Sequence, residues 1–369
     1  MMLQFMFAFL IVVFVQGVVY HLLALRGLTY SCTILHKRIF EGETNELLEV
    51  IENRKLLPLL WMKVETRFSE TMLFTKNDNT RVSAGVFHRS TLSVPPLRRI
   101  NRVYKIVCTK RGYYPLGSAT VTTGDVLGFI VKSLSYVPES GLHVYPVPLP
   151  QNALNLPTRS FLGDVIVKRF FLPDPFMQAG IRDYVPGDPQ NLINWKASAK
   201  SRKLVVQKND YTSDSKLMVF FNVDYKAESW DNTGPKKTYA LEYAVRLLAT
   251  VLDFSISFGQ QTALCTNATS LRTTKEITVP PAMGKAHREE LFSAMAEIQF
   301  VHSRSFHMLL KEAVEVVRGF DILLMTRYIT SDIIAESDAL RRAGNKVEIL
   351  IIPDCLQEQQ PPEGGALYG

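Results

Sequence analysis

The chain has 369 residues, of which 47% are hydrophobic and 21% are charged. This composition excludes a wholly disordered chain, and the length predicts more than one domain. The formal net charge of +7 favours contact with an acidic partner or an anionic membrane surface. The four cysteines lie far apart and form no C-x-x-C pair, so free thiols are expected rather than a disulfide framework.

The amino-terminal segment is apolar throughout. Residues 1–25 contain no Asp, Glu, Lys or Arg, and Leu3 to Leu25 would extend about 35 Å as a helix, enough to cross a bilayer. No basic residue precedes the run and no small-residue cleavage site closes it, so residues 1–27 are predicted to be an uncleaved transmembrane anchor rather than a signal peptide. The flanking basic residues all follow the helix, which predicts cytoplasmic soluble domains at the cell membrane: Arg26, Lys37 and Arg38.

Residues 30–150 read as short extended runs broken by turn residues, which predicts a β-sandwich. The expected strands are Glu46 to Glu52, Leu60 to Phe68, Val103 to Thr109, Ser118 to Thr122 and Phe129 to Ser133. Six basic residues lie close together here: Arg98, Arg99, Arg102, Lys105, Lys110 and Arg111. Only one aromatic residue is interleaved among them, so a solvated strand face is favoured over a nucleic-acid site, and no nucleic-acid partner is expected.

Residues 151–215 are rich in Pro, Asp and Arg and are predicted to be a connector. From 216 to 353 buried strands alternate with amphipathic helices, which predicts an α/β domain with a mostly parallel sheet. The expected strands are 216–223, 262–265, 321–325 and 347–352, and the expected helices are 238–254, 286–296, 306–317 and 331–342. Residues 354–369 are rich in Gln, Glu, Pro and Gly and are predicted to be a disordered tail.

The connector contains the densest motif of the chain, residues 182–206, here called the signature segment. Pro186-Gly187 fits the centre of a type II turn that would bring Arg182 and Asp188 close enough to pair. Trp195 is expected to be a large apolar anchor, with Lys196 and Lys200 forming an outward positive stripe. Three interpretations stay open: a buried bracket that locks the connector to the sheet, a partner-binding surface, or a chemical site.

The signature segment resembles that of the bacterial domain-of-unknown-function family 58 (DUF58). The matching positions are Arg182, Asp183, Tyr184, Gly187, Asp188, Ile193, Trp195, Lys196, Ser198, Ala199, Lys200, Leu204 and Val206. Gln190, Asn191 and Gln207 depart from the arginines common in the family. The resemblance implies a von Willebrand A-like carboxyl half and partnership with a MoxR-type AAA+ ATPase and a transglutaminase-like membrane protein.

A working von Willebrand A metal site requires an Asp-x-Ser-x-Ser loop after the first strand, because a hard divalent cation prefers oxygen ligands. The corresponding residues here are Asp224 to Glu228, and Lys226 brings an ammonium where a hydroxyl ligand belongs. Asp224, the one weak metal candidate, is therefore expected to be a solvated strand-end residue. His302 and His307 are five residues apart and would not share one face of a helix, so no zinc site is expected from them.

The sequence contains no G-x-S-x-G elbow or complete phosphate loop, and Cys265 has no basic neighbour to activate it. These patterns predict a membrane-anchored, non-catalytic interaction protein without a cofactor. Two alternatives stay open: a ligand-binding module that holds a divalent metal near Asp224, and a hydrolase with unrecognised residues.

Overall fold

The computed structural model describes residues 2–69, 71–74, 81–83, 87–125, 127–137, 141–150, 178–184, 193–209, 216–224, 235–257 and 259–352. The chain divides into two compact units, residues 1–146 and 147–369. Each unit is described by itself below. The predicted type II turn at Pro186-Gly187, Lys226 and the predicted tail lie outside the described residues.

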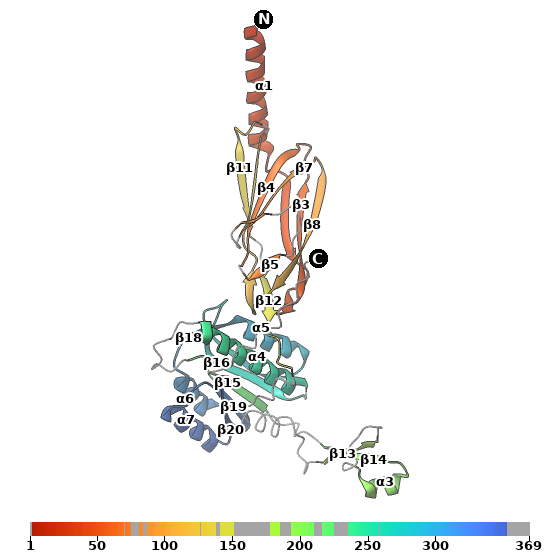
Figure 1. The fold of residues 1–369 in the computed structure, drawn as a ribbon, viewed down its shortest axis with the longest axis vertical. Helices are drawn as coiled ribbons and strands as arrows, with labels where there is room; N and C mark the ends of the chain where they lie inside the picture. The colour runs from red at the N-terminus through yellow and green to blue at the C-terminus, as the bar shows by residue number, and fades with distance from the viewer. Residues whose placement is uncertain are drawn as a thin grey trace. The chain divides into compact units, whose positions relative to one another are not determined.

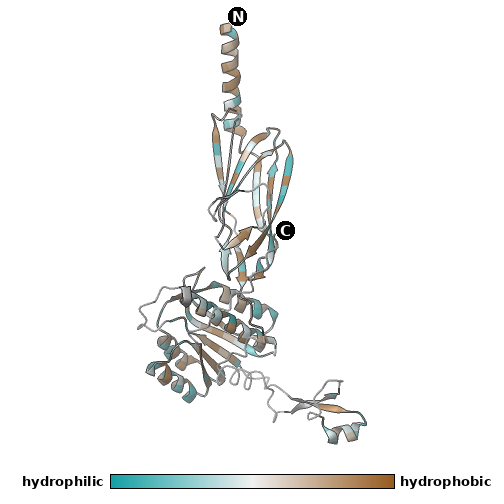
Figure 2. Ribbon diagram, in the orientation of Figure 1, coloured by the Kyte–Doolittle hydropathy of each residue, from teal (hydrophilic) through white to brown (hydrophobic). Residues whose placement is uncertain are grey.

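Unit 1 begins with helix α1 (Met2–Leu23), which is long and apolar enough to cross a membrane. Nearly all of its residues are exposed, and only Gly17 and Tyr20 are buried. Figure 2 shows the apolar colouring of α1 along most of its length. A helix that is apolar on every side and still exposed is typical of a membrane span. An N-terminal helix of this kind therefore supports the predicted anchor.

The rest of unit 1 is mainly antiparallel β-structure with a sandwich core (Figure 1), and the parallel pairing of β2 with β12 is an exception. One sheet has the order β1-β3-β8-β5 and the other β11-β10-β4-β7-β6, while a third, small sheet has the order β2-β12-β9. The strands are β1 (Leu28–Ile34), β2 (Arg38–Phe40), β3 (Thr44–Asn53), β4 (Leu59–Arg67), β5 (Met72–Phe74), β6 (Arg81–Ser83), β7 (Phe87–Val94), β8 (Arg98–Cys108), β9 (Gly112–Pro115), β10 (Ala119–Gly124), β11 (Val131–Tyr136) and β12 (Gly141–Tyr145).

The sandwich core forms because alternate residues of the strands face inward. Leu47 and Ile51 of β3 meet Met62 and Val64 of β4 in one buried cluster. A carboxylate lies within this core: Glu49 is only 2% exposed. It accepts hydrogen bonds from the hydroxyls of Tyr30 (3.0 Å) and Tyr104 (3.2 Å) and lies 3.4 Å from Arg102.

The basic run therefore differs from its prediction at two positions. Arg102 lies against the buried Glu49, and Arg111 is itself buried, so neither belongs to a plain solvated face. The prediction of free thiols is confirmed for Cys32, Cys108 and Cys265. Cys355 lies outside the described residues.

Unit 2 contains a five-stranded path with the order β17-β16-β15-β19-β20. The strands are β15 (Lys216–Phe221), β16 (Gln261–Ser270), β17 (Glu276–Ala282), β18 (Ile298–His302), β19 (Phe320–Thr326) and β20 (Lys346–Ile351). β15, β16, β19 and β20 are parallel, and β17 is antiparallel to β16. β18 pairs with the carboxyl half of β16.

Among the described residues of unit 2, the helices that cover this sheet are α4 (Pro235–Ser257), α5 (Lys285–Glu297), α6 (Phe306–Val316) and α7 (Ser331–Arg342). α4 contacts α5 and α6 contacts α7, the two pairs lying on opposite faces (Figure 1). Met218 and Phe220 pack with Leu309 and Leu310 of α6 in one core cluster. Because both faces are covered, β15 is buried from Leu217 to Phe221 without alternation.

A smaller element of unit 2, which we call the signature lobe, spans the described residues of 178–209. Strands β13 (Gln178–Asp183) and β14 (Val205–Asn209) form an antiparallel pair. Helix α3 (Trp195–Ser201) precedes β14. The predicted connector thus includes a hairpin and a helix.

Candidate functional site

Helix α3 of the signature lobe begins at Asn194, whose side chain accepts the Ala197 N–H at 3.0 Å, and ends at Arg202 in a left-handed conformation. Ser198 ties the helix to β14, because its Oγ accepts the Val205 N–H at 3.0 Å. Ser198, Val205 and Val206 are buried. Of the matched signature residues whose side chains are described, Ser198 is thus one that serves the internal structure of the lobe.

Trp195 is 67% exposed, which contradicts its prediction as a buried anchor. A seven-residue helix, about two turns long, beside a two-stranded sheet offers too little surface to cover an indole, which explains the error. Lys196 and Lys200 are exposed as predicted. They are four residues apart, so they lie on the same face of α3. The Trp195 ring and the two lysine side chains of α3 therefore lie open to solvent.

The remaining signature residues are placed only in part. Asp183 is exposed and Tyr184 half-buried, and the Tyr184 N–H donates to the Leu204 carbonyl at 2.9 Å. Arg182 lies in β13 opposite Val206, and its side chain is not among those described. Gly187 and Asp188 lie outside the described residues, so the predicted Arg182–Asp188 pair stays a prediction.

A second polar site lies at the carboxyl edge of the sheet in unit 2. After β15 the chain continues to β16 on one side, while β19 lies on the other, so the strand order reverses at β15. Ligand sites of open α/β sheets lie at the carboxyl ends of the strands where this reversal occurs. Asn222, Asp224 and Thr326 come directly after or at the ends of the two central strands.

Side-chain amides fix the geometry of this edge. Asn222 is fully buried, and its Nδ2 donates to Thr326 Oγ1 at 3.0 Å. The fully buried Asn267 of β16 donates to Asn222 Oδ1 at 3.2 Å and accepts the Val223 N–H at 3.0 Å. Because the buried amides satisfy one another and the backbone, the loop after β15 starts from a rigid base.

Asp224 is 7% exposed, so the prediction of a solvated residue is wrong. Its Oδ2 accepts the Phe306 N–H at 3.0 Å and thereby caps the start of α6, where Ser305 supplies no side-chain cap. Burial raises the pKa of the Asp224 carboxyl, although the Phe306 amide and His302 oppose this shift. Sequence reasoning missed this contact because it joins residues 82 positions apart.

His302 and His307 do not share a helix, which corrects the assumption behind their spacing argument. His302 ends β18, whereas His307 lies in α6. His302 Nδ1 lies 3.2 Å from Asp224 Oδ1, and the His302 side chain is 61% exposed. The described residues contain no group of three His, Cys, Asp or Glu side chains arranged to hold a metal ion.

These features define a protein with an N-terminal apolar helix, a β-sandwich, and an α/β unit that carries the signature lobe. The family model described as "Protein of unknown function DUF58" matches residues 180–367. The match covers half of the chain, and the chain belongs to this family.

One curated relative is the uncharacterized protein YeaD of Bacillus subtilis, 25% identical over 171 residues, which are 46% of this chain and 41% of that protein. The chain thus spans less than half the length of this relative. Among solved structures, a CARDB domain from Pyrococcus furiosus covers 32% of this chain and 91% of its own, at 14% identity and a TM-score of 0.22. A cohesin module from Clostridium perfringens covers 32% and 97%, at 12% identity and a TM-score of 0.23. At these TM-scores the likeness carries no argument about this chain.

Proposed function

We propose that this protein is a membrane-anchored, non-catalytic interaction protein, and that the signature lobe is the surface it offers to a partner. The observation that carries the proposal is the 67% exposure of Trp195. Tryptophan is among the residues that contribute most to protein interfaces, and its exposure to water is unfavourable until a partner covers it. Lys196 and Lys200, one helical turn apart, add charge that would orient an acidic partner surface.

The domain that carries the lobe is proposed to be von Willebrand A-like. Its central parallel strands, the antiparallel edge strand β17 and the position of Asp224 after the first strand β15 support this assignment. Family resemblance suggests the partner, a MoxR-type AAA+ ATPase, with a transglutaminase-like membrane protein as a further associate. Envelope assembly or the stress response would be the setting.

Helix α1 is proposed to be a single-pass anchor in the cell membrane. Its length and apolar composition support a span. Arg26, Lys37 and Arg38 follow it, and the excess of basic residues on that side supports cytoplasmic soluble units.

The test is capture of a purified MoxR-type ATPase by the full-length protein in detergent. We expect Trp195→Ala to weaken capture at least tenfold, and Lys196→Glu with Lys200→Glu to weaken it several-fold and more strongly at low salt. Lys311→Glu, an exposed lysine of α6, is the matched control. All variants should unfold at the wild-type temperature, because exposed side chains contribute little to stability. Undiminished capture by folded Trp195→Ala protein would refute the role of the lobe.

A second candidate is a divalent-metal-dependent ligand-binding module, favoured by the position of Asp224 where the strand order reverses. Against it, Asp224 Oδ2 already accepts the Phe306 N–H. Calorimetric titration with Mg²⁺ or Mn²⁺ separates the two proposals. A saturable isotherm that Asp224→Ala abolishes would favour the metal module, whereas we expect no saturable binding in the micromolar range. For a hydrolase, the third possibility, the Asp224–His302 pair is a candidate among the described residues, and loss of activity in His302→Ala would support it.

A further inference from the structure

Helix α1 is attached to one end of the sandwich by polar contacts. The Tyr20 hydroxyl donates to the Pro58 carbonyl at 2.9 Å. Lys55 Nζ donates to the carbonyls of Ala24 and Arg26, and Lys132 Nζ donates to that of His21. These ammonium groups satisfy carbonyls at or just beyond the carboxyl end of the helix, so α1 and this end of the sandwich are held together.

The length of α1 determines how deep this attachment must lie. Its 22 residues extend about 33 Å, close to the ~30 Å hydrocarbon core of a bilayer. The part before Gly17, residues 2–16, extends only roughly 22 Å and cannot cross the core alone. A span therefore requires the last two turns of α1 as well. Whatever packs against those turns lies at the edge of the hydrocarbon layer.

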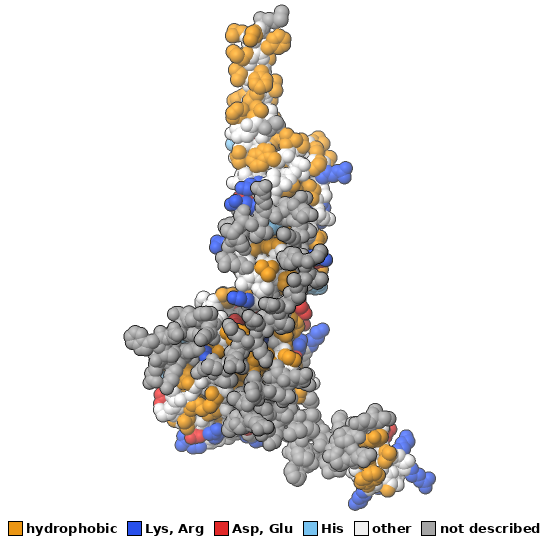
Figure 3. All heavy atoms as spheres, viewed as in Figure 1, with side chains coloured by type: hydrophobic (Ala, Val, Ile, Leu, Met, Phe, Trp, Pro, Cys, Tyr) orange, Lys and Arg blue, Asp and Glu red, His pale blue; other side chains and the backbone are white. Residues whose placement is uncertain are grey.

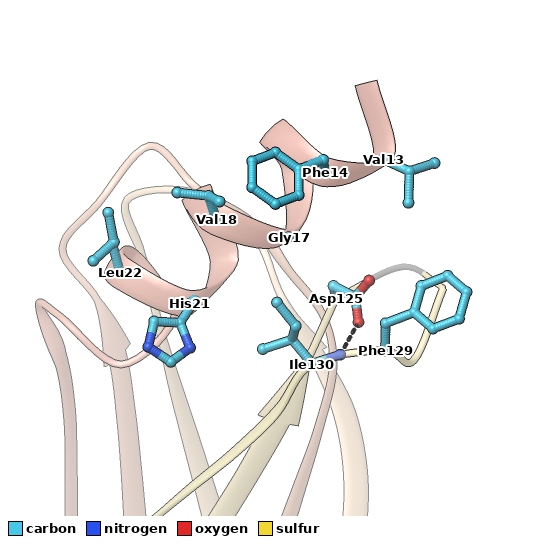
Figure 4. A pocket seen from close by; sticks show the side chains of 9 residues that line it. All are labelled: Val13, Phe14, Gly17, Val18, His21, Leu22, Asp125, Phe129 and Ile130. Atoms are coloured by element: carbon cyan, nitrogen blue, oxygen red, sulfur yellow. Dashed lines mark hydrogen bonds between the residues drawn. The ribbon is translucent and has the colours of Figure 1, made fainter. Parts of the chain in front are cut away.

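The loop between β10 and β11 packs against those turns (Figure 4). A Cβ added to Gly17 would lie 3.1 Å from Ile130 Cδ1, so the helix and the loop approach closely. Between them lies a hollow of about 380 Å³ with a mainly apolar lining that includes Val13, Phe14 and Phe129. Phe129 is 76% exposed although it lies at the level of residues inside the apolar part of α1.

The other loops at this end also present apolar side chains. The strand register places them together, because Leu28 pairs with Asn53, Asn53 with Arg98, and Leu59 with Val94. Leu56 is 77% and Leu97 64% exposed. Leu97 also has a left-handed φ of 53°, a conformation that branched side chains rarely adopt.

Basic side chains surround these apolar tips. Arg26, Arg54, Arg98 and Arg99 are exposed, with Lys55 and Lys132 half-buried beside them. Figure 3 shows basic side chains just beyond the apolar length of α1. Apolar tips among basic side chains match the two layers of a membrane surface, acyl chains below and anionic phosphates above.

We propose that this end of the sandwich is a membrane-contact surface, seated in the interfacial layer of an anionic leaflet with Phe129, Leu97 and Leu56 reaching the acyl boundary. The proposal rests on the proposed anchor, since it is α1 that fixes the depth. The leaflet also fills the hollow between α1 and the β10–β11 loop. The sandwich then has a fixed orientation relative to the membrane and does not reorient freely about a flexible linker.

The experiment uses the full-length protein in nanodiscs that contain phosphatidylcholine and phosphatidylglycerol at about three to one. One exposed cysteine per variant, Phe129→Cys or Leu97→Cys, carries a nitroxide label in a Cys355→Ser background. Burial raises the pKa of the remaining thiols, that of Cys265 to about 11, so they react slowly. Leu35→Cys, 62% exposed just past the far end of β1, is the matched control, and Val12→Cys reports on α1.

Collision with oxygen and with a water-soluble nickel chelate distinguishes lipid, water and protein surroundings, because lipid admits oxygen alone. We expect labels at 129 and 97 to show at least a threefold higher oxygen-to-nickel ratio than the label at 35. Pure phosphatidylcholine should lower their ratios. Labels at 129 and 97 that match position 35 while the label at 12 is deep would refute the contact surface and leave the anchor intact. A water-exposed label at 12 would refute the anchor, and the contact surface with it.

Discussion

The buried Asp224 carboxylate gives a test that separates its charge from its hydrogen bond. Burial raises the folded-state pKa above the unfolded value of about 3.9, so the folded protein holds this proton more tightly. Stability therefore falls as the pH rises from about 3.9 through the folded pKa, and at neutral pH the ionised carboxylate destabilises the fold. Asp224→Asn removes that charge but keeps an oxygen that can accept the Phe306 N–H.

We expect Asp224→Asn to unfold at the same temperature as the wild type, or up to roughly 3 °C higher, at pH 7.5. Its advantage should shrink toward pH 4 as the wild-type carboxyl becomes protonated. Asp224→Ala should lose the cap, about 1 kcal/mol, which lowers the melting temperature by roughly 2–4 °C. The His302 pair changes this little, because that side chain is 61% exposed.

Scanning calorimetry across pH measures both effects, and hydrogen-exchange mass spectrometry should show that the first turn of α6 loses protection in Asp224→Ala alone. The reasoning fails if Asp224→Asn is destabilised at pH 7.5 as much as Asp224→Ala. The carboxylate charge would then stabilise the native state, and burial would not dominate.

Three further predictions concern the sandwich of unit 1 and the membrane topology. Glu49→Ala should cost roughly 2–4 kcal/mol in urea unfolding, because it leaves the buried hydroxyls of Tyr30 and Tyr104 without their acceptor, whereas Glu49→Gln should cost less. Burial, aided by Arg102, lowers the pKa of His88 to about 4. The stability that neutral His88 contributes is therefore present above pH 6.5 and is lost as the pH falls toward 4. His88→Phe should remove up to roughly 3 kcal/mol of this acid dependence of the unfolding free energy, and an unchanged pH profile would contradict the prediction. A reporter fused after Pro353 should be active only in its cytoplasmic format, and activity of the exported format would reverse the proposed topology.

The helices and central strands of unit 2 could be predicted because their periodicity is local. The predicted helix 331–342 matches α7, and predicted strands overlap β15, β16, β19 and β20. β17 was missed because Pro280 and Pro281 argue against a strand. Both prolines are tolerated there because β17 is an edge strand. β18 was missed because it follows α5 with no intervening turn residues.

In unit 1 the strand β1 carried a signal that was overlooked. Its residues alternate strictly between buried and exposed, a pattern masked by the apolar run that precedes it. β3 was predicted, but its adjacent apolar residues at 47–48 and 50–51 point to opposite faces of the strand. The apolar pattern therefore does not show which face is buried, and the burial of Glu49 could not be predicted.

The candidate sites were harder to predict than the fold. The burial of Asp224 depends on a contact with Phe306, which is distant in sequence. The exposure of Trp195 depends instead on how little of the described chain packs against α3. Ser198 was placed in the signature by resemblance, and only the structure reveals its tie to Val205.

The pairing of β18 with β16 matters to anyone who would engineer a divalent-cation site into this edge. β16 extends past the last residue that it pairs with on β15, and β18 lies along that extension, bringing His302 to Asp224. Adding serine or aspartate ligands after β15 would therefore be insufficient. A cation would need the carboxylate of Asp224, whose Oδ2 already accepts the Phe306 N–H and whose Oδ1 faces His302. A designer would therefore first have to give α6 another cap and move the end of β18 aside.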